Sequence, residues 1–172
     1  MPRNVEIKAR ASDPARLRAL ALDLGDGPPV VIEQDDTFFA TATGRLKLRA
    51  FADGRGELIF YERPDRTGPR TSRYALAPVD DAAALREVLA AALPVRGRVR
   101  KRRELLLAGR TRIHLDRVEG LGDFLELEVV LAADEETAAG EAEARALMAR
   151  LEVAPGDLVA EAYLDLQDGR WR

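Results

Sequence analysis

The sequence predicts an α+β fold in which about eight short strands form a mainly antiparallel sheet around a polar barrel lumen. Two observations lead to this prediction. Short runs of alternating polarity follow one another at hairpin-like spacing, and two or three helical segments interrupt them. In five of these runs one face carries charges and the other carries aliphatic side chains. The aliphatic faces would pack outward against the helices, so the charged faces would point inward.

The charged faces share one feature, which is that charged or polar residues recur at every second position. The first run has Val5, Ile7 and Ala9 on its apolar face. In chain order, the polar faces carry Asn4, Glu6, Lys8 and Arg10; Arg45, Lys47 and Arg49; Lys101 and Arg103; Arg112, His114 and Asp116; and Glu126 and Glu128. Because unpaired buried charge is costly, such faces can converge on a lumen only if the lumen is wet or holds a charged ligand.

Length and composition are those of a globular protein. With 172 residues, 47% of them hydrophobic and 33% charged, we expect one domain covering residues 1–172. The absence of cysteine excludes disulfides and thiolate chemistry, and with one histidine it argues against a zinc site. No run is long enough to span a bilayer and no signal segment is evident, so we expect a cytoplasmic location without membrane contact. The net charge of −3 argues against a nucleic-acid partner.

The first half of the chain begins with the strand 4–10. A helix is expected from Pro14 to about Leu24, capped by Ser12 or Asp13 and ended by Gly25. Strands should follow at 30–39, 45–49, 57–61 and 72–76, with a hairpin turn at 53–56.

The second half begins with a helix that Asp80 or Asp81 caps and that ends at 93–94. Strands are expected at 99–107, 111–116 and 124–131, with turns at 108–109 and 120–122. A third helix over 135–151, a short helix at 155–160 and an extended piece at 163–166 complete the chain.

The charges that share the predicted lumen suit a polyphosphate with a divalent metal. Lysine and arginine neutralise phosphoryl oxygens, and arginine can bind them bidentately. Carboxylates hold Mg²⁺ or Mn²⁺, which bridges the same oxygens.

An ordered set of motifs spans nearly the whole chain. The motifs are Val5-Glu6-Ile7-Lys8, the Gln34–Phe38 segment, Arg45–Arg49, the turn from Tyr61 to Pro64, Lys101 with Arg103, Ile113–Asp116, Gly120–Glu128 and Tyr163. Together they resemble the CYTH superfamily, or triphosphate tunnel metalloenzymes, with Val5–Lys8 similar to the second half of its ExExK signature. That superfamily includes class IV adenylyl cyclases and thiamine, inorganic and RNA triphosphatases. The resemblance implies an eight-stranded antiparallel tunnel that binds a triphosphate end-on with one or two divalent metals.

The resemblance also implies roles for individual residues. Glu6, Glu126 and Glu128 would hold Mg²⁺ or Mn²⁺. Lys8, Asp116 and Glu126 would act in catalysis by positioning water and phosphate. The triphosphate would contact Lys8, Arg45, Lys47, Arg49, Lys101, Arg103 and Arg112. Proteins of this kind are often dimers, so a homodimer is expected.

Two positions depart from the family pattern. Asn4 stands where the signature has its first glutamate, so one metal ligand becomes a neutral amide. Glu62 stands where a lysine is common, two residues before Pro64. Arg63 is next to it, but in a regular strand we expect Arg63 to face the other way unless a bulge intervenes.

The leading functional hypothesis is hydrolysis of the terminal phosphate of inorganic triphosphate, ATP or thiamine triphosphate. One alternative is a class IV adenylyl cyclase, in which the ribose 3′-hydroxyl attacks the α-phosphorus and pyrophosphate leaves. Another is a non-catalytic polyphosphate or nucleotide binder, which the two departures favour. Simpler interpretations remain for single residues. Glu6 and Lys8 could form a solvated strand face, and the basic run 96–103 could bind nucleic acid or be solvated. His114 could be structural, Asp116 could cap a turn, and Tyr163 could be core or close the tunnel mouth.

Overall fold

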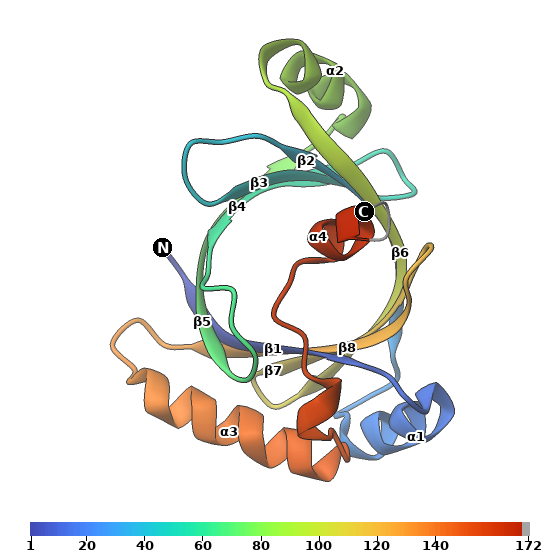
Figure 1. Ribbon diagram of the computed structural model, residues 1–172, viewed down its shortest axis with the longest axis vertical. Coiled ribbons are helices and arrows are strands. Elements are labelled where there is room, and N and C mark those ends of the chain that lie inside the picture. The colour runs from blue at the N-terminus through green and yellow to red at the C-terminus, as the bar shows by residue number, and fades with distance from the viewer. Residues whose placement is uncertain (170–172) are drawn as a thin grey trace.

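The computed structural model describes residues 1–169, and eight antiparallel strands dominate it (Figure 1). They are β1 (Arg3–Arg10), β2 (Val30–Phe39), β3 (Arg45–Ala50), β4 (Gly56–Glu62), β5 (Arg70–Val79), β6 (Val95–Ala108), β7 (Thr111–Val118) and β8 (Gly122–Leu131). They form a closed ring in the order β1-β5-β4-β3-β2-β6-β7-β8. The ring closes at β1, which pairs with β5 on one side and with β8 on the other. The predicted α+β barrel is confirmed; residues 170–172 of the expected domain lie outside the described part.

Four helices and one 3₁₀ turn flank the ring. They are α1 (Pro14–Leu24), α2 (Ala82–Ala92), α3 (Thr137–Arg150), the 3₁₀ turn at Pro155–Asp157 and α4 (Tyr163–Asp168). Of the two candidate caps at each helix, Asp13 accepts from the Arg16 amide at 3.0 Å and Asp81 accepts from the Ala84 amide at 2.9 Å. None of the helices within residues 1–169 is long and apolar enough to cross a membrane.

The main hydrophobic core lies outside the ring, between one side of the barrel and two helices. The aliphatic faces of β1, β6, β7 and β8 meet α1 and α3 there, as the alternation predicts (Figure 1). The fully buried members include Val5, Ile7, Ile113, Leu125, Leu127 and Val129. Each outward aliphatic side chain therefore fixes its neighbours in the strand to the inner face.

Helix α3 approaches β1 and β8 closely because Gly140 faces them. A Cβ atom at Gly140 would lie 2.6 Å from Leu131 Cδ2 and 2.9 Å from Val5 Cγ2. Real Cβ atoms essentially never lie this close to another atom, so a larger residue would force the Leu131 and Val5 side chains or the helix to shift.

The C-terminal segment differs from the prediction. An extended piece at 163–166 was expected, but Tyr163–Asp168 is a helix, and the expected helix at 155–160 is only the 3₁₀ turn at Pro155–Asp157. Tyr163 and Leu164 pack into a second core cluster with Phe38, Val99 and Phe124. Leu164 fits there because Gly97 has no side chain; a Cβ atom at Gly97 would lie 2.5 Å from Leu164 Cδ1. Tertiary packing therefore decides this segment, which sequence pattern alone does not specify.

Gly140→Ala should destabilise the fold. The added methyl group improves helix propensity slightly, but the overpacking against Leu131 and Val5 costs about 1–3 kcal/mol. Denaturant unfolding measures the difference. Gly156→Ala is the control, because nothing lies within 4 Å of its Cβ position, and it should stay within about 0.5 kcal/mol of the parent. A Gly140→Ala protein as stable as this control would contradict the close packing.

Candidate functional site

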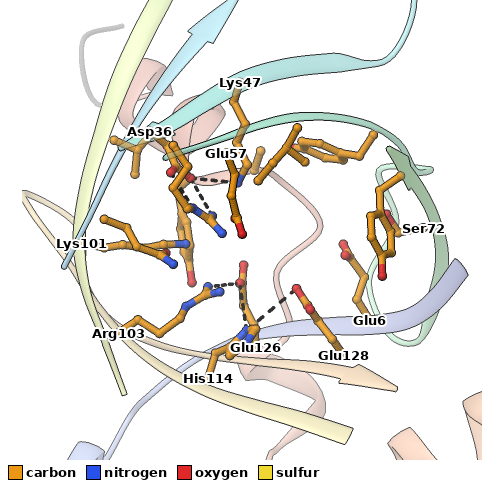
Figure 2. Close-up of a pocket in the computed structure, with 18 of the residues that line it drawn as sticks. Glu6, Asp36, Lys47, Glu57, Ser72, Lys101, Arg103, His114, Glu126 and Glu128 are labelled. Carbon is orange, nitrogen blue, oxygen red and sulfur yellow. Dashed lines mark hydrogen bonds and ion pairs between the residues drawn. The ribbon is translucent and has the colours of Figure 1, made fainter. Parts of the chain in front are cut away.

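The ring of strands encloses a cavity of about 360 Å³ that receives side chains from all eight strands (Figure 2). Among residues 1–169, seven cationic side chains and five carboxylates line this cavity. The cations are Lys8, Lys47, Arg49, Arg63, Lys101, Arg103 and Arg112, and the carboxylates are Glu6, Asp36, Glu57, Glu126 and Glu128. The cavity is thus positive on balance although the chain carries a net charge of −3. Its volume suits a small molecule, and its charge favours an anion.

One wall of the cavity is organised by Asp36 of β2. Lys47 Nζ donates to Asp36 Oδ2 at 2.8 Å, and Arg49 of the same strand donates to both carboxylate oxygens at 2.8 and 2.9 Å. Burial alone would raise the pKa of Asp36, but Arg49 and Lys47 outweigh it and hold the pKa well below its usual range. Burial, with Arg49 adding to it, lowers the pKa of Lys47 to about 8. The two cations therefore lie fixed side by side, with their charge only partly compensated.

The opposite wall is organised by Glu126 of β8. Lys8 Nζ lies 3.3 Å from Glu126 Oε1, and Arg103 Nη2 donates to Glu126 Oε2 at 2.6 Å. Burial would raise the pKa of Glu126, but Lys8, Lys101 and Arg103 outweigh it, so this pKa lies well below its usual range. Glu126 therefore stays ionised at neutral pH.

Asp116 lies behind this wall and holds its cations in place. It accepts two hydrogen bonds from Arg103 at 2.6 Å, one from the Tyr163 hydroxyl at 3.0 Å, and lies 3.3 Å from Lys101 Nζ. Asp116 is fully enclosed and does not line the cavity. Burial would raise its pKa, but Arg103 and Lys101 outweigh burial and lower it.

His114 of β7 lies beside Glu126 and Glu128 at the base of the cavity (Figure 2). One donor atom from each of the three residues lies within 4.8 Å of the others, close enough for one metal ion to contact all of them. His114 Nδ1 is buried without a hydrogen-bond partner among residues 1–169. An ionised carboxylate pair with an unpartnered nitrogen is a donor set that fits a divalent cation.

Glu6 faces this group from β1, where it is the cross-strand neighbour of Glu128. Its Oε1 lies 3.2 Å from both Arg63 Nη1 and Arg70 Nε. Burial raises the pKa of Glu6 to about 7; Glu128 and Glu126 add to the rise, and Arg63 opposes it. Glu6 is therefore a carboxyl group that can exchange a proton near neutral pH.

The C-terminal segment lies across one end of the ring of strands (Figure 1), and its residues Ala162 and Tyr163 line the cavity. The Val159 amide donates to the Lys8 carbonyl at 2.9 Å, and Lys8 Nζ donates to the Glu161 carbonyl at 3.1 Å. The Tyr163 ring lies 3.7 Å from Lys8 Nζ and 4.9 Å from Lys101 Nζ, close enough for cation–π contacts. This segment positions two cavity lysines.

The structure brings most of the residues predicted for the site into one cavity. Glu6, Lys8, Lys47, Arg49, Lys101, Arg103, Arg112, Glu126 and Glu128 all line it. Arg45 lies apart, where it pairs with Asp65 at 2.8 Å and Asp165 at 3.1 Å. Asp116 acts from behind through Arg103, Lys101 and Tyr163.

The expectation for Arg63 is wrong, because this side chain does line the cavity. Residues Ile59 and Tyr61 of β4 also face inward, so Arg63 follows at the same two-residue period and no bulge is needed. Glu62, between Tyr61 and Arg63, takes the exposed position. Alternation counted from Ile59 and Tyr61 could have placed Arg63 in the lumen.

Three further charged residues were missed. Glu57 lies on β4 with the inward-facing Ile59 and Tyr61, so the same two-residue alternation could have indicated it. Asp36 lies two residues from both Gln34 and Phe38, which face the cavity, so alternation along β2 could have shown that Asp36 faces inward too. Arg70 begins β5 after a polar loop, where the sequence carries no signal for its burial or its pairing with Glu6.

Comparisons with known proteins give one family. The sequence pattern of the family described as CYTH domain matches residues 2–163. A search of curated proteins finds no match.

Solved structures share the fold at low sequence identity. A Pyrococcus horikoshii protein superposes with a TM-score of 0.84 at 23% identity, covering 95% of this chain and 98% of its own. A candidate adenylate cyclase from Vibrio parahaemolyticus gives 0.74 at 18% identity, with 96% and 97% coverage. A candidate adenylyl cyclase from Hippeastrum, described as having a dominant triphosphatase activity, gives 0.66 at 17% identity, with 98% and 95% coverage.

The raised pKa of Glu6 predicts a pH dependence of stability. The folded chain holds a proton on Glu6 up to about pH 7, whereas a free carboxyl group loses it near pH 4.5. Folding therefore takes up a proton in this window, and the contribution of Glu6 to stability falls as the pH rises through it. Relative to Glu6→Gln, the wild-type free energy of unfolding should drop by roughly 2–3 kcal/mol between pH 4.5 and 8. Denaturant unfolding across this range measures the drop, and a pH-independent difference would rule out the protonated carboxyl.

Proposed function

This chain belongs to the CYTH domain family, and from that premise we propose that its barrel binds a triphosphate compound with Mg²⁺ or Mn²⁺ and hydrolyses the terminal phosphate. One observation carries the proposal. One cavity inside the ring of strands combines seven cations with a carboxylate–histidine group that could hold one metal ion. Cations alone would suit many anions, and carboxylates alone would suit many metals. Their combination suits an anion that arrives with a metal bound to it.

The cations of the two walls would bind the phosphate chain. Lys47 and Arg49 approach from the Asp36 wall, and Lys101 and Arg103 approach from the Glu126 wall. Each side chain is already held by a carboxylate, so binding would cost little reorganisation. Burial lowers the pKa of Lys8 and Lys101, and that of Lys47 to about 8, so an arriving anion would also stabilise their charged forms.

Glu126 and Glu128 are the residues best placed to hold the metal, with Glu6 facing them across β1 and β8. When bound, the metal would neutralise charge on the phosphoryl oxygens and help to align them. The reaction is attack of water on the terminal phosphorus, which breaks one P–O–P bond and releases orthophosphate and the shortened chain. Glu6 can take up a proton near neutral pH, and it lies in the same cavity as the proposed metal ligands. The protein acts mainly by positioning and charge neutralisation.

A binder without turnover is the second candidate, and Asn4 favours it. Asn4 lines the cavity where the family signature carries a glutamate, and its Oδ1 has no partner among residues 1–169. Glu6 already forms ion pairs with Arg63 and Arg70. With no carboxylate at position 4 and the Glu6 carboxylate paired with arginines, metal binding would be weaker, whereas anion binding would still be possible.

A product assay separates these candidates. The purified protein is incubated with tripolyphosphate, ATP or thiamine triphosphate and with Mg²⁺ or Mn²⁺, and the products are separated by chromatography. Orthophosphate with the shortened chain is the expected result. Cyclic AMP with pyrophosphate would favour the adenylyl cyclase, and tight binding without any product would favour the binder.

Glu126→Gln and Glu128→Gln should each lower metal-dependent turnover by roughly 100-fold with the fold intact, because each removes a charged metal ligand. Circular dichroism and turnover measure the two effects. Asp123→Asn is the control, since this carboxylate pairs with exposed Arg117 outside the cavity and its loss should leave turnover unchanged. Unfolding of both glutamine variants would mean that these carboxylates are structural.

Lys101→Ala should weaken tripolyphosphate binding by roughly 10–100-fold, because a charge-assisted contact contributes about 1.5–3 kcal/mol. Calorimetry measures the affinity. Arg102→Ala is matched to it, because Arg102 is the next residue of β6 and points outward into solvent. Equal affinities for the two variants would mean that Lys101 does not contact the bound tripolyphosphate.

A further inference from the structure

The group of Glu126, Glu128 and His114 that could hold a metal ion contains the one histidine of the chain. His114 lies in the middle of β7 with its side chain buried. The Nδ1 atom has no hydrogen-bond partner among residues 1–169. A buried nitrogen without a partner costs free energy, so its presence in a cavity lined with charges needs a physical reason.

The atom of His114 that faces the two glutamates is Nδ1. A neutral imidazole carries one N–H group and one free lone pair, and this lone pair is the part of the ring that binds metals. An unpartnered Nδ1 beside two carboxylates is therefore placed as a metal ligand would be.

The distances suit a shared ion better than direct hydrogen bonds. His114 Nδ1 lies 4.0 Å from Glu126 Oε2 and 3.9 Å from Glu128 Oε1. Both separations are too long for a hydrogen bond. Ligand atoms bound at about 2.0–2.2 Å to one ion at tetrahedral angles lie roughly 3.3–3.6 Å apart, so a shift of a few tenths of an ångström in these side chains would let one ion contact all three atoms.

Both carboxylates keep acceptor capacity next to His114. Arg112 donates to Glu128 Oε2 at 3.0 Å, which leaves Oε1 as the oxygen nearer to His114. Arg103 donates to Glu126 Oε2, and a carboxylate oxygen has a second lone pair for an ion. The arginines thus hold both carboxylates beside Nδ1 without using all of their acceptor capacity.

We infer that His114 Nδ1 is a direct ligand of the ion held by Glu126 and Glu128, and that it shifts the preference of the site from Mg²⁺ towards ions that accept imidazole. The inference rests on the proposed function only in placing a metal in this cavity. Carboxylate and water ligands suit Mg²⁺ and Mn²⁺, whereas imidazole suits Zn²⁺ and its neighbours in the first transition row. A mixed set of two carboxylates and one imidazole favours Mn²⁺ or Zn²⁺. His114 is then a specificity-determining residue.

The single histidine makes a direct test possible. Untagged protein is grown with ¹⁵N-labelled histidine, so every labelled side-chain signal comes from residue 114. Addition of ¹¹³Cd²⁺ should shift the Nδ1 signal until one equivalent is bound, and should split it by scalar coupling to cadmium, which passes only through a bond. Mg²⁺ should shift it little. Cadmium binding, seen by calorimetry, without coupling to Nδ1 would overturn the inference, as would a failure of Cd²⁺, Zn²⁺ and Mn²⁺ to bind.

Variants test the metal preference. His114→Leu removes the donor atom and should weaken Zn²⁺ binding at least ~10-fold while changing Mg²⁺ binding less than about threefold. His114→Asn offers an amide oxygen and should bring the two affinities closer together. Equal losses for Zn²⁺ and Mg²⁺ in both variants would mean that His114 only supports the fold of the site. The labelled wild-type spectrum decides the question if a variant does not fold.

The outcomes also separate this inference from the proposed function. If the protein hydrolyses tripolyphosphate with Mg²⁺ but shows no cadmium–nitrogen coupling, the proposed function is supported and the assignment of His114 as a metal ligand is overturned. If the coupling is present but no substrate is turned over, the assignment of His114 is supported and the proposed function is overturned.

Discussion

The structure depends on the mutual compensation of charges inside a closed ring of strands. Seven cations and five carboxylates share a cavity of about 360 Å³, and a lone charge there would be strongly penalised. Four carboxylates carry most of the compensation, since each pairs with at least two cations: Asp36, Glu126 and Glu6 line the cavity, and Asp116 lies behind its wall. The outer core keeps these pairs in place, because each buried aliphatic residue of β1, β7 or β8 forces its neighbours inward.

This compensation is incomplete, and the imbalance gives the cavity its chemical character. Excess positive charge and lowered lysine pKa values favour an incoming anion, whereas the group at Glu128, Glu126 and His114 favours a cation. A ligand that carries both, such as a metal-bound phosphate chain, satisfies both preferences. The C-terminal segment adds a further constraint, because Glu161 and Tyr163 hold Lys8 at one end of the cavity. The site is therefore organised before a ligand arrives.

The sequence predicted much of this arrangement because both of its main signals are local. Alternation along β1, β6 and β8 identified which side chains point inward, and hairpin spacing identified the antiparallel ring. The same alternation extends to Arg63, which follows Ile59 and Tyr61 past the end of β4, although the prediction placed it on the other face. Two features lay beyond local pattern. Arg70 is buried by partners distant in the sequence, and Leu164 of α4 packs on Gly97. Both depend on contacts between segments that no local pattern records.

The most direct test is a crystal structure of the protein with tripolyphosphate and Mn²⁺, with the metal located by its anomalous scattering. The account predicts a manganese peak inside the barrel beside Glu126 and Glu128. It also predicts phosphate density between the wall of Lys47 and Arg49 and the wall of Lys101 and Arg103. Phosphate bound only on the outer surface, with the barrel cavity empty of both metal and anion, would contradict it.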